Sequence, residues 1–203
     1  MKRLIIAAFF CAFASLITAQ EQRETFERNS WNWQETATKK NSTIIQDGYL
    51  VITSKKGSNV VTTRFPMNVQ RNFKMIAKIL LPKYDKKSGL PVFGIVFDAA
   101  GTDAFLIMPN LIGKNKTNNK KMTLFLNGER QEQKMPFNAN KKNAEVIITV
   151  ESRGGKLSID VDGMTVFTDM KAGFKTSDWG FVVGGGEIKV DEIIINQVAE
   201  EEY

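Results

Sequence analysis

Residues 157–167, with the sequence LSIDVDGMTVF, carry the clearest fold signal of this chain. Apolar residues at 157, 159 and 161 alternate with polar residues between them. This period of two is typical of a β-strand that has one face in a core and the other in water. Asp162-Gly163 follows, and such pairs accept the positive φ angles of a tight hairpin turn. The stretch therefore predicts two antiparallel strands joined by a two-residue turn.

The same two signals recur in both directions along the chain. Three further turn pairs separate apolar runs: Asp47-Gly48, Asn127-Gly128 and Gly154-Gly155. No window has a sustained 3.6-residue apolar period, so we expect almost no helix. The predicted strands are 42–45, 49–53, 59–65, 72–81, 92–98, 104–108, 122–126, 144–151, 156–161, 165–168, 179–183 and 188–196.

Short strands joined this often need two stacked sheets to bury their apolar faces. In the segment 72–81, the alternation predicts that Lys74 and Lys78 point outward. The residues predicted to point into the core are Phe73, Met75, Ala77, Ile79 and Leu81. We therefore predict an all-β fold, a two-sheet antiparallel jelly-roll sandwich.

The first nineteen residues have the layout of a secretory signal peptide. Lys2 and Arg3 precede an apolar run over 4–17, and Thr18 and Ala19 follow it. No later stretch reaches the roughly 18 apolar residues of a membrane-spanning helix. We expect a signal peptide over 1–19, a single sandwich domain over 20–203, and export to the periplasm or the extracellular space.

Composition excludes several kinds of chemistry. The single cysteine, Cys11, lies in the predicted signal peptide, so we expect no disulfide in the exported chain. The sequence has no histidine, which removes the usual general base and a common metal ligand. The net charge is +6, but the lysine clusters at 39–40 and 114–121 contain no aromatic residues. This pattern argues against nucleic acid as a partner.

The region from Gly48 to the end resembles the concanavalin A-like lectin and glucanase superfamily, in particular its laminin-G-like modules. The stretches that carry the resemblance are DGYLVI at 47–52, FGIVFD at 93–98, AFLI at 104–107, the quoted 157–167, WGFVV at 179–183 and VDEIIIN at 190–196. The resemblance implies a glycan or polysaccharide as ligand, bound on the concave sheet or its rim. Some bacterial members process 3-keto-glycosides. The Glu-x-Asp-x-x-Glu strand of the superfamily's glucanases is absent, which argues against a laminarinase-type hydrolase.

Two tryptophans and an arginine are candidate ligand-binding residues. Trp31 and Trp33 are two apart, so in an extended segment they face the same way and form a stacking platform for sugar rings. The alternative is that they plug one end of the sandwich. Arg64 is placed to pair with a sugar acid or with a neighbouring carboxylate.

Carboxylates are the other candidates. Asp98 ends a predicted strand whose outward residues are small, and Asp103 follows it shortly, so both are candidates to line a concavity. The alternative for Asp98 is an ordinary turn aspartate. Paired carboxylates perform acid and base catalysis on glycosides when they face each other. The remaining candidates for such a pair are Glu35, Asp160, Asp162, Asp191 and Glu192.

The resemblance also implies a structural calcium ion, the one cofactor that we consider. Asp191, together with backbone carbonyls and an acid near the N-terminus such as Glu27, would supply oxygen ligands. Asp191 and Glu192 lie on opposite faces of a regular strand, so both can reach one ion only if the strand bulges. The run Gly184-Gly185-Gly186 is interpreted as a flexible hairpin turn.

Three functions are consistent with these observations. The leading hypothesis is an exported carbohydrate-binding, lectin-like module without catalytic activity. The first alternative is a glycoside-processing hydrolase or lyase of the 3-keto-glycoside type that uses carboxylates. The second alternative is a protein-interaction or adhesion module that uses an exposed sheet face.

Overall fold

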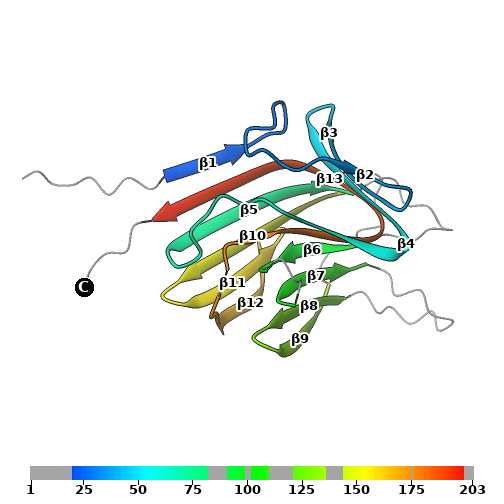
Figure 1. Ribbon diagram of the computed structural model, residues 1–203. Coiled ribbons are helices and arrows are strands. Elements are labelled where there is room, and N and C mark those ends of the chain that lie inside the picture. Colours follow the sequence, from blue (N-terminus) through cyan, green and yellow to red (C-terminus); the bar gives the residue numbers. More distant parts are fainter. Residues whose placement is uncertain are drawn as a thin grey trace, which may run out of the picture.

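The computed structural model describes residues 20–81, 91–98, 102–109, 121–135, 144–174 and 176–198. The predicted signal peptide, residues 1–19, lies outside the described residues. All secondary structure in the described part is β-strand (Figure 1). No helix there is long and apolar enough to cross a membrane. The strands are β1 Gln20–Glu24, β2 Thr36–Ala37, β3 Asn41–Gln46, β4 Tyr49–Thr63, β5 Asn72–Leu80, β6 Val92–Val96, β7 Ala104–Met108, β8 Lys121–Leu126, β9 Glu129–Lys134, β10 Glu145–Arg153, β11 Lys156–Val161, β12 Met164–Lys171 and β13 Gly180–Val198.

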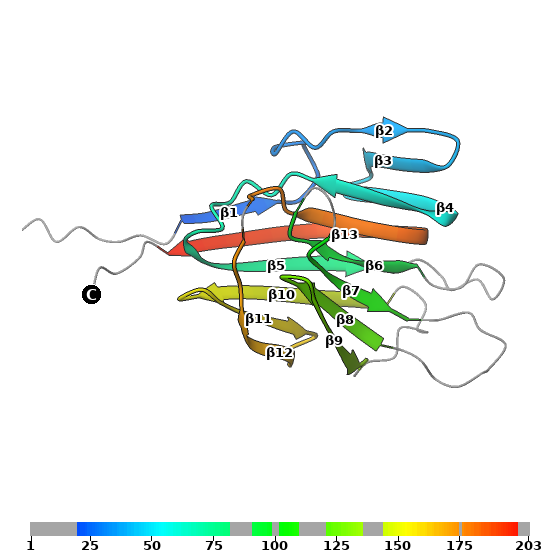
Figure 2. The same cartoon turned by 60° about the horizontal axis from the view of Figure 1, so that its bottom comes forward.

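All strand pairs are antiparallel, and β13 lies at the centre of the arrangement. The hydrogen-bonded order is β12-β11-β10-β5-β13-β6-β7-β8-β9. On its other side β13 pairs with β4 and β1, and β4 continues to β3 and β2. Figures 1 and 2 show the two layers, with β5, β10, β11 and β12 in one and β6 to β9 in the other.

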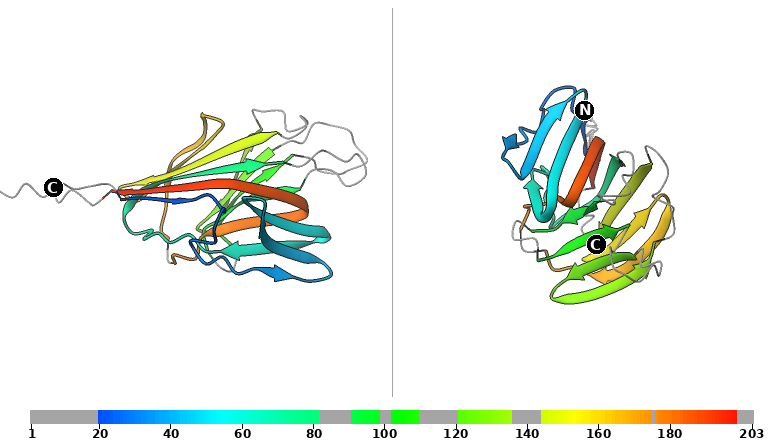
Figure 3. Two further views of the ribbon diagram at one scale, coloured as in Figure 1. Left: turned by 90° about the horizontal axis from the view of Figure 1, so that it is seen from above. Right: turned by 90° about the vertical axis from the view of Figure 1, so that its right-hand side faces the viewer.

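Strand β13 joins the two layers because it bends. Its residues 180–184 pair with β6, and its residues 189–198 pair with β5. The pairing with β4 shifts register between Gly184 and Gly186, where residues 55–58 of β4 bulge out opposite Gly185. Gly185 has a φ of 69°, a region that favours glycine. Figure 3 shows the strand curving round between its orange and red parts.

The interpretation of Gly184-Gly185-Gly186 as a hairpin turn is therefore wrong. The three glycines lie inside one long strand and allow it to pass from one sheet to the other. The predicted strands 179–183 and 188–196 are the two halves of β13. In the same way, the predicted strands 49–53 and 59–65 are the two parts of β4.

The core is formed by apolar side chains from both layers, and the predicted alternation is confirmed where it was clearest. In β5 and directly after it, Phe73, Met75, Ala77, Ile79 and Leu81 are each at most 2% exposed. Trp179 is fully buried and contacts Phe73 and Phe97 edge-on or tilted, with ring centroids 5.2 and 4.5 Å away. The buried residues form one connected cluster.

The turn predictions are confirmed, whereas three strands were missed. Both residues of every quoted turn pair have positive φ angles, between 51° and 79°. The missed strands are β1, β2 and β9. Strand β9, ERQEQK, is almost wholly exposed and pairs with β8 through its backbone. Its sequence therefore has no apolar alternation to reveal it.

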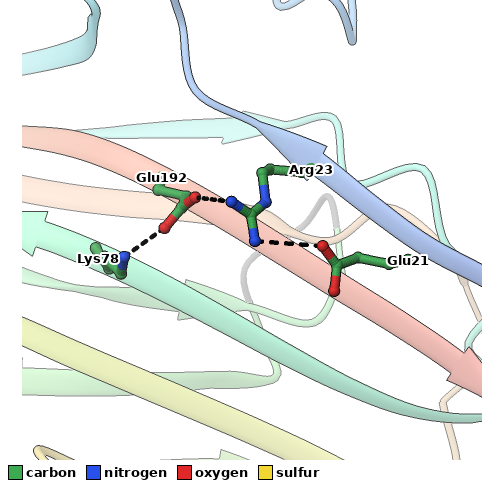
Figure 4. A network of polar contacts seen from close by, with 4 residues as sticks. All are labelled: Glu21, Arg23, Lys78 and Glu192. Atoms are coloured by element: carbon green, nitrogen blue, oxygen red, sulfur yellow. Dashed lines mark hydrogen bonds and ion pairs between the residues drawn. The ribbon is translucent and has the colours of Figure 1, made fainter.

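A row of charges crosses the outer side of β5, β13 and β1 (Figure 4). The Glu192 carboxylate bonds to Lys78 Nζ at 2.5 Å and to Arg23 at 3.2 Å, and Arg23 also reaches Glu21. The hydrogen bond to Glu192 raises the pKa of Lys78 above its ordinary value of 10.5. Glu192 is thus engaged with two cations on the outer surface.

Candidate functional site

Loops at one rim of the sandwich enclose a hollow of about 530 Å³, which we call the central hollow. Such a volume lies in the usual range of small-ligand sites. Its walls come from the β6–β7 loop, the β8–β9 turn and the segment between β12 and β13. The lining residues are Phe97, Asp98, Thr102, Asp103, Asn127, Gly128, Gly173, Phe174, Thr176 and Asp178.

Asp98 holds the β6–β7 loop in shape. Its carboxylate accepts hydrogen bonds from Thr102 N at 3.0 Å, Thr102 Oγ1 at 2.6 Å and Asp103 N at 3.0 Å. Phe97 N donates to Asp103 O at 2.8 Å, which closes the loop from the other side. Asp98 therefore stabilises the loop that carries Asp103, as expected of a turn aspartate. It also lines the central hollow.

Asp103 and Asn127 tie three separate loops together. Asp103 Oδ1 accepts a hydrogen bond from Asn127 N at 3.1 Å, and Asn127 Nδ2 donates to Lys171 O at 2.9 Å. Residues from β6–β7, β8–β9 and the end of β12 thus meet in one network. This network fixes the polar groups of the central hollow before any ligand arrives.

Phe174 gives the hollow an aromatic wall. Its ring is half-buried and packs against Trp179 and Phe97, with centroids 4.7 and 5.6 Å away. Gln70 Nε2 donates to Phe174 O at 2.9 Å, so the backbone is held as well. The hollow therefore presents one apolar ring among carboxyl, amide and hydroxyl groups.

A second hollow of about 440 Å³ adjoins the central one, and we call it the tryptophan hollow. The two share Asp178. Its lining residues are Gln22, Ser30, Trp31, Asn32, Arg64, Phe65, Pro66, Ser177 and Asp178. A third hollow of about 360 Å³, between Leu124, Gln131 and Met170, shares Asn127 and Gly173 with the central one. The rim thus carries a line of three adjoining hollows.

The backbone of Trp31 is held from both sides in the tryptophan hollow. Buried Glu24 accepts hydrogen bonds from Trp31 N at 2.8 Å and from Phe26 N at 3.1 Å. Arg64 Nε donates to Trp31 O at 3.0 Å. The Trp31 backbone is therefore held beside the arginine, and its half-buried indole packs against the core.

The predicted platform of two tryptophans is wrong, because Trp33 lies in the core. Its side chain is 2% exposed and packs against Phe26, Phe65 and Phe181, with ring centroids 5.8 to 6.1 Å away. The chain between the tryptophans is not extended, since Asn32 has a φ of 54°. Trp33 thus follows the alternative of a plug, and Trp31 alone lines a hollow.

The structure brings most of the other predicted ligand-binding residues to one rim. Asp98 and Asp103 line the central hollow, and Arg64 lines the tryptophan hollow with Trp31. Arg64 forms no ion pair with a carboxylate of the described residues, so the alternative of a surface pair does not hold for them.

Sequence reasoning missed several residues of the central hollow. Asn127 was recognised only as a turn residue, and Phe174, Thr176 and Asp178 lie in a connection without a periodic pattern. The sole available signal was the aromatic and polar composition of that connection, which directly precedes buried Trp179.

The other candidate carboxylates do not converge on the rim. Glu35 accepts from Ile45 N at 3.1 Å, and Asp162 accepts from Ile147 N at 2.9 Å. Asp160 lines a separate polar hollow on β10 to β12. Glu192 belongs to the charge row of Figure 4. These four side chains therefore do not provide a facing pair with Asp98 or Asp103.

The residues proposed for calcium lie on β13 and near the N-terminus. Strand β13 does bulge between Val190 and Glu192 where it pairs with β5, as the two-carboxylate arrangement required. In the described ranges, however, no three acidic, histidine or cysteine side chains form a group that could hold a metal ion. The predicted site of Asp191, Glu27 and backbone carbonyls is a different arrangement and stays a prediction. Measuring thermal unfolding with Ca²⁺ and with a chelator would test it.

No protein-family model and no curated protein matches the sequence. Solved structures do match the fold. The CBM2 module of the evolved Dit protein of Lactobacillus casei BL23 phage J-1 is 9% identical, with a TM-score of 0.58 over 92% of this chain and 100% of that chain. The lectin UEA-II, complexed with galactose, is 12% identical, with a TM-score of 0.55 over 88% of this chain and 98% of that chain.

An enzyme structure has the same architecture. The β-glucanase of Bacillus licheniformis is 12% identical, with a TM-score of 0.53 over 89% of this chain and 98% of that chain. Identities this low establish the fold and leave the ligand to the site. The prediction of the fold is confirmed, whereas the narrower laminin-G-like assignment stays a prediction. The chain is an all-β, two-sheet antiparallel jelly-roll sandwich of the concanavalin A-like kind.

Proposed function

We propose that this protein is an exported carbohydrate-binding module and that the central hollow is its sugar site. The observation that carries the proposal is the combination in one hollow of an aromatic wall, Phe174, with the polar groups of Asp103, Asn127 and Asp178. The resemblance to the superfamily and fold neighbours that include a lectin support it as well.

The chemistry of a sugar matches this lining. A pyranose ring has apolar C–H faces that pack on aromatic rings, and hydroxyls that both donate and accept hydrogen bonds. Carboxylates accept strongly from hydroxyls, and side-chain amides and threonine hydroxyls add donors. Because the loops are already tied together, binding would require little further ordering of the protein.

A binding role is favoured over catalysis by the work that Asp98 already does. Three loop hydrogen bonds occupy its carboxylate, so this side chain already has the structural task of shaping the β6–β7 loop. The 3-keto-glycoside enzyme remains a second candidate because Asp98, Asp103 and Asp178 line one hollow. Turnover of a 3-keto-glycoside or chromogenic glycoside that Asp103→Asn abolishes would establish it.

A glycan-array screen of the purified protein tests the binding proposal. We expect specific binding that Asp103→Asn weakens at least tenfold, because the amide can still accept from Asn127 N but loses the charge that favours hydroxyl donors. The matched control is Asp160→Asn, which changes charge equally on a different surface and should bind as the wild type does.

Two array results would overturn the proposal. Binding that Asp103→Asn leaves unchanged would place the site elsewhere. Absence of binding to any glycan would favour the protein-interaction or adhesion alternative. Export is tested separately, since mass spectrometry of the mature protein should find its N-terminus at Gln20.

A further inference from the structure

We propose that the tryptophan hollow is a second sugar subsite and that it selects a sugar carrying a negative charge, either a carboxylate or a sulfate ester. The inference rests on the proposed carbohydrate-binding function. It specifies the ligand further, as an acidic oligosaccharide or polysaccharide that occupies both hollows.

The position of the tryptophan hollow makes it a neighbouring subsite. It is comparable in size to the central hollow, about 440 against 530 Å³, and the two share Asp178 as a common wall residue. A ligand long enough to pass Asp178 would therefore contact both hollows. Linked sugar rings provide such a ligand.

Arg64 is the source of selectivity for charge. Its side chain is exposed, and its Nε donates to Trp31 O at 3.0 Å, which restrains the guanidinium beside the tryptophan. Its two terminal nitrogens have no acceptor among the residues that the structure describes. A planar fork of N–H donors matches the two oxygens of a carboxylate or sulfate group. The arginine is thus oriented and still has donors to offer.

Trp31 supplies the stacking surface beside that charge. The indole is half-buried, so part of the ring remains accessible, and Glu24 fixes its backbone from the other side. Neutral polar side chains complete the lining, namely Gln22, Ser30, Asn32 and Ser177. These groups suit hydroxyls, so the hollow is arranged for a sugar rather than a free anion.

Asp178 orients the charged group. Asp178 lines both hollows, whereas Arg64 lines the tryptophan hollow and does not line the central one. Asp178 repels an anionic group of the ligand where the two hollows meet, and Arg64 attracts it inside the tryptophan hollow. The two charges therefore favour one direction of the ligand, with its acidic group toward Arg64.

Matched glycan pairs that differ only in the anionic group test the inference. One set pairs uronate oligosaccharides with their methyl esters, and the other pairs sulfated with desulfated oligosaccharides. We expect the acidic member to bind at least tenfold more tightly. Arg64→Gln should remove that preference, because it weakens binding of the acidic member far more than binding of the neutral member. Raising the salt concentration should weaken acidic binding to the wild type more than to Arg64→Gln.

Lys74→Gln is the control variant. Lys74 is exposed on the outer side of β5 and lines none of the three hollows. Its replacement by glutamine therefore lowers the net charge by one, as Arg64→Gln does, without altering the proposed site. It should keep the wild-type preference. Thermal unfolding of Arg64→Gln should match the wild type, which separates lost binding from a disturbed Trp31 loop.

The outcomes distinguish this inference from the proposed function. Equal binding of both members of each pair, or equal weakening of both by Arg64→Gln, would overturn the acidic subsite and leave the sugar site standing. A preference that Lys74→Gln also removes would show a general charge effect and overturn it too. If no member of any pair and no other glycan binds, the proposed function fails and the inference fails with it.

Discussion

The aromatic core and the rim above it use two tryptophans from one loop in different ways. Trp33 is 2% exposed and packs among Phe26, Phe65 and Phe181, whereas Trp31 is half-buried and lines the tryptophan hollow. The loop between them turns through Asn32, whose positive φ breaks the extended geometry. Trp33 thus anchors the loop in the core, whereas Trp31 packs at the edge of the core and keeps part of its ring exposed. Stability and binding should therefore be separable within this loop.

The largest effect is expected from Trp33→Ala. Truncating a fully buried aromatic side chain costs about 3–5 kcal/mol of the free energy of unfolding. Chemical denaturation of the variant and the wild type measures it. Trp33→Phe should cost much less, because the Trp33 Nε1 donor has no hydrogen-bond partner in the described structure. A small loss for Trp33→Ala would contradict the assignment of this residue to the core.

The next largest effect is expected from Glu24→Ala, because Glu24 links the two regions. Its carboxylate accepts from Phe26 N on the core side and from Trp31 N on the rim side. Removing an acceptor of buried donors costs about 1–3 kcal/mol. Glu24→Gln, which keeps one acceptor, should lose less. If neither variant changes the unfolding midpoint, the loop is not held in this way.

Trp31→Ala should affect binding more than stability. We expect affinity for an acidic oligosaccharide to fall about tenfold, equivalent to about 1.4 kcal/mol. The denaturation midpoint should move far less than in Trp33→Ala. Calorimetric titration and denaturation of the same preparation provide both numbers. If Trp31→Ala loses as much stability as Trp33→Ala, the two tryptophans do not have separate roles in stability and binding.

The smallest effect is expected on the outer surface, from Lys78→Gln. The pKa of Lys78 is raised chiefly by its hydrogen bond to Glu192. A raised amine pKa stabilises the fold below the ordinary value of 10.5 and loses that contribution as pH rises through the folded-state pKa. The stability difference between wild type and variant should be at most about 1 kcal/mol, as for solvent-exposed pairs. It should shrink above pH 10.5, and a difference that grows there would contradict the pairing.

Much of the rim site was identifiable before the structure, but not its assembly. Asp98, Asp103, Arg64 and Trp31 were candidates because each combines a chemically useful side chain with a strand end or loop. Asn127 and Phe174 were not, since their sequence surroundings show only a turn and an irregular connection. Their role depends on three loops, distant in the sequence, meeting at one rim.

The sequence by itself determined most of the strands, the turn pairs and the all-β sandwich, because alternation and positive-φ pairs act over a few residues. Only the tertiary structure decided that β13 continues through Gly184-Gly185-Gly186, that Trp33 turns inward while Trp31 does not, and that Asp103 meets Asn127. Each of these depends on pairing or packing between segments far apart in the chain. Local periodicity carries no information about such contacts, and the closing of the two sheets around one core creates them.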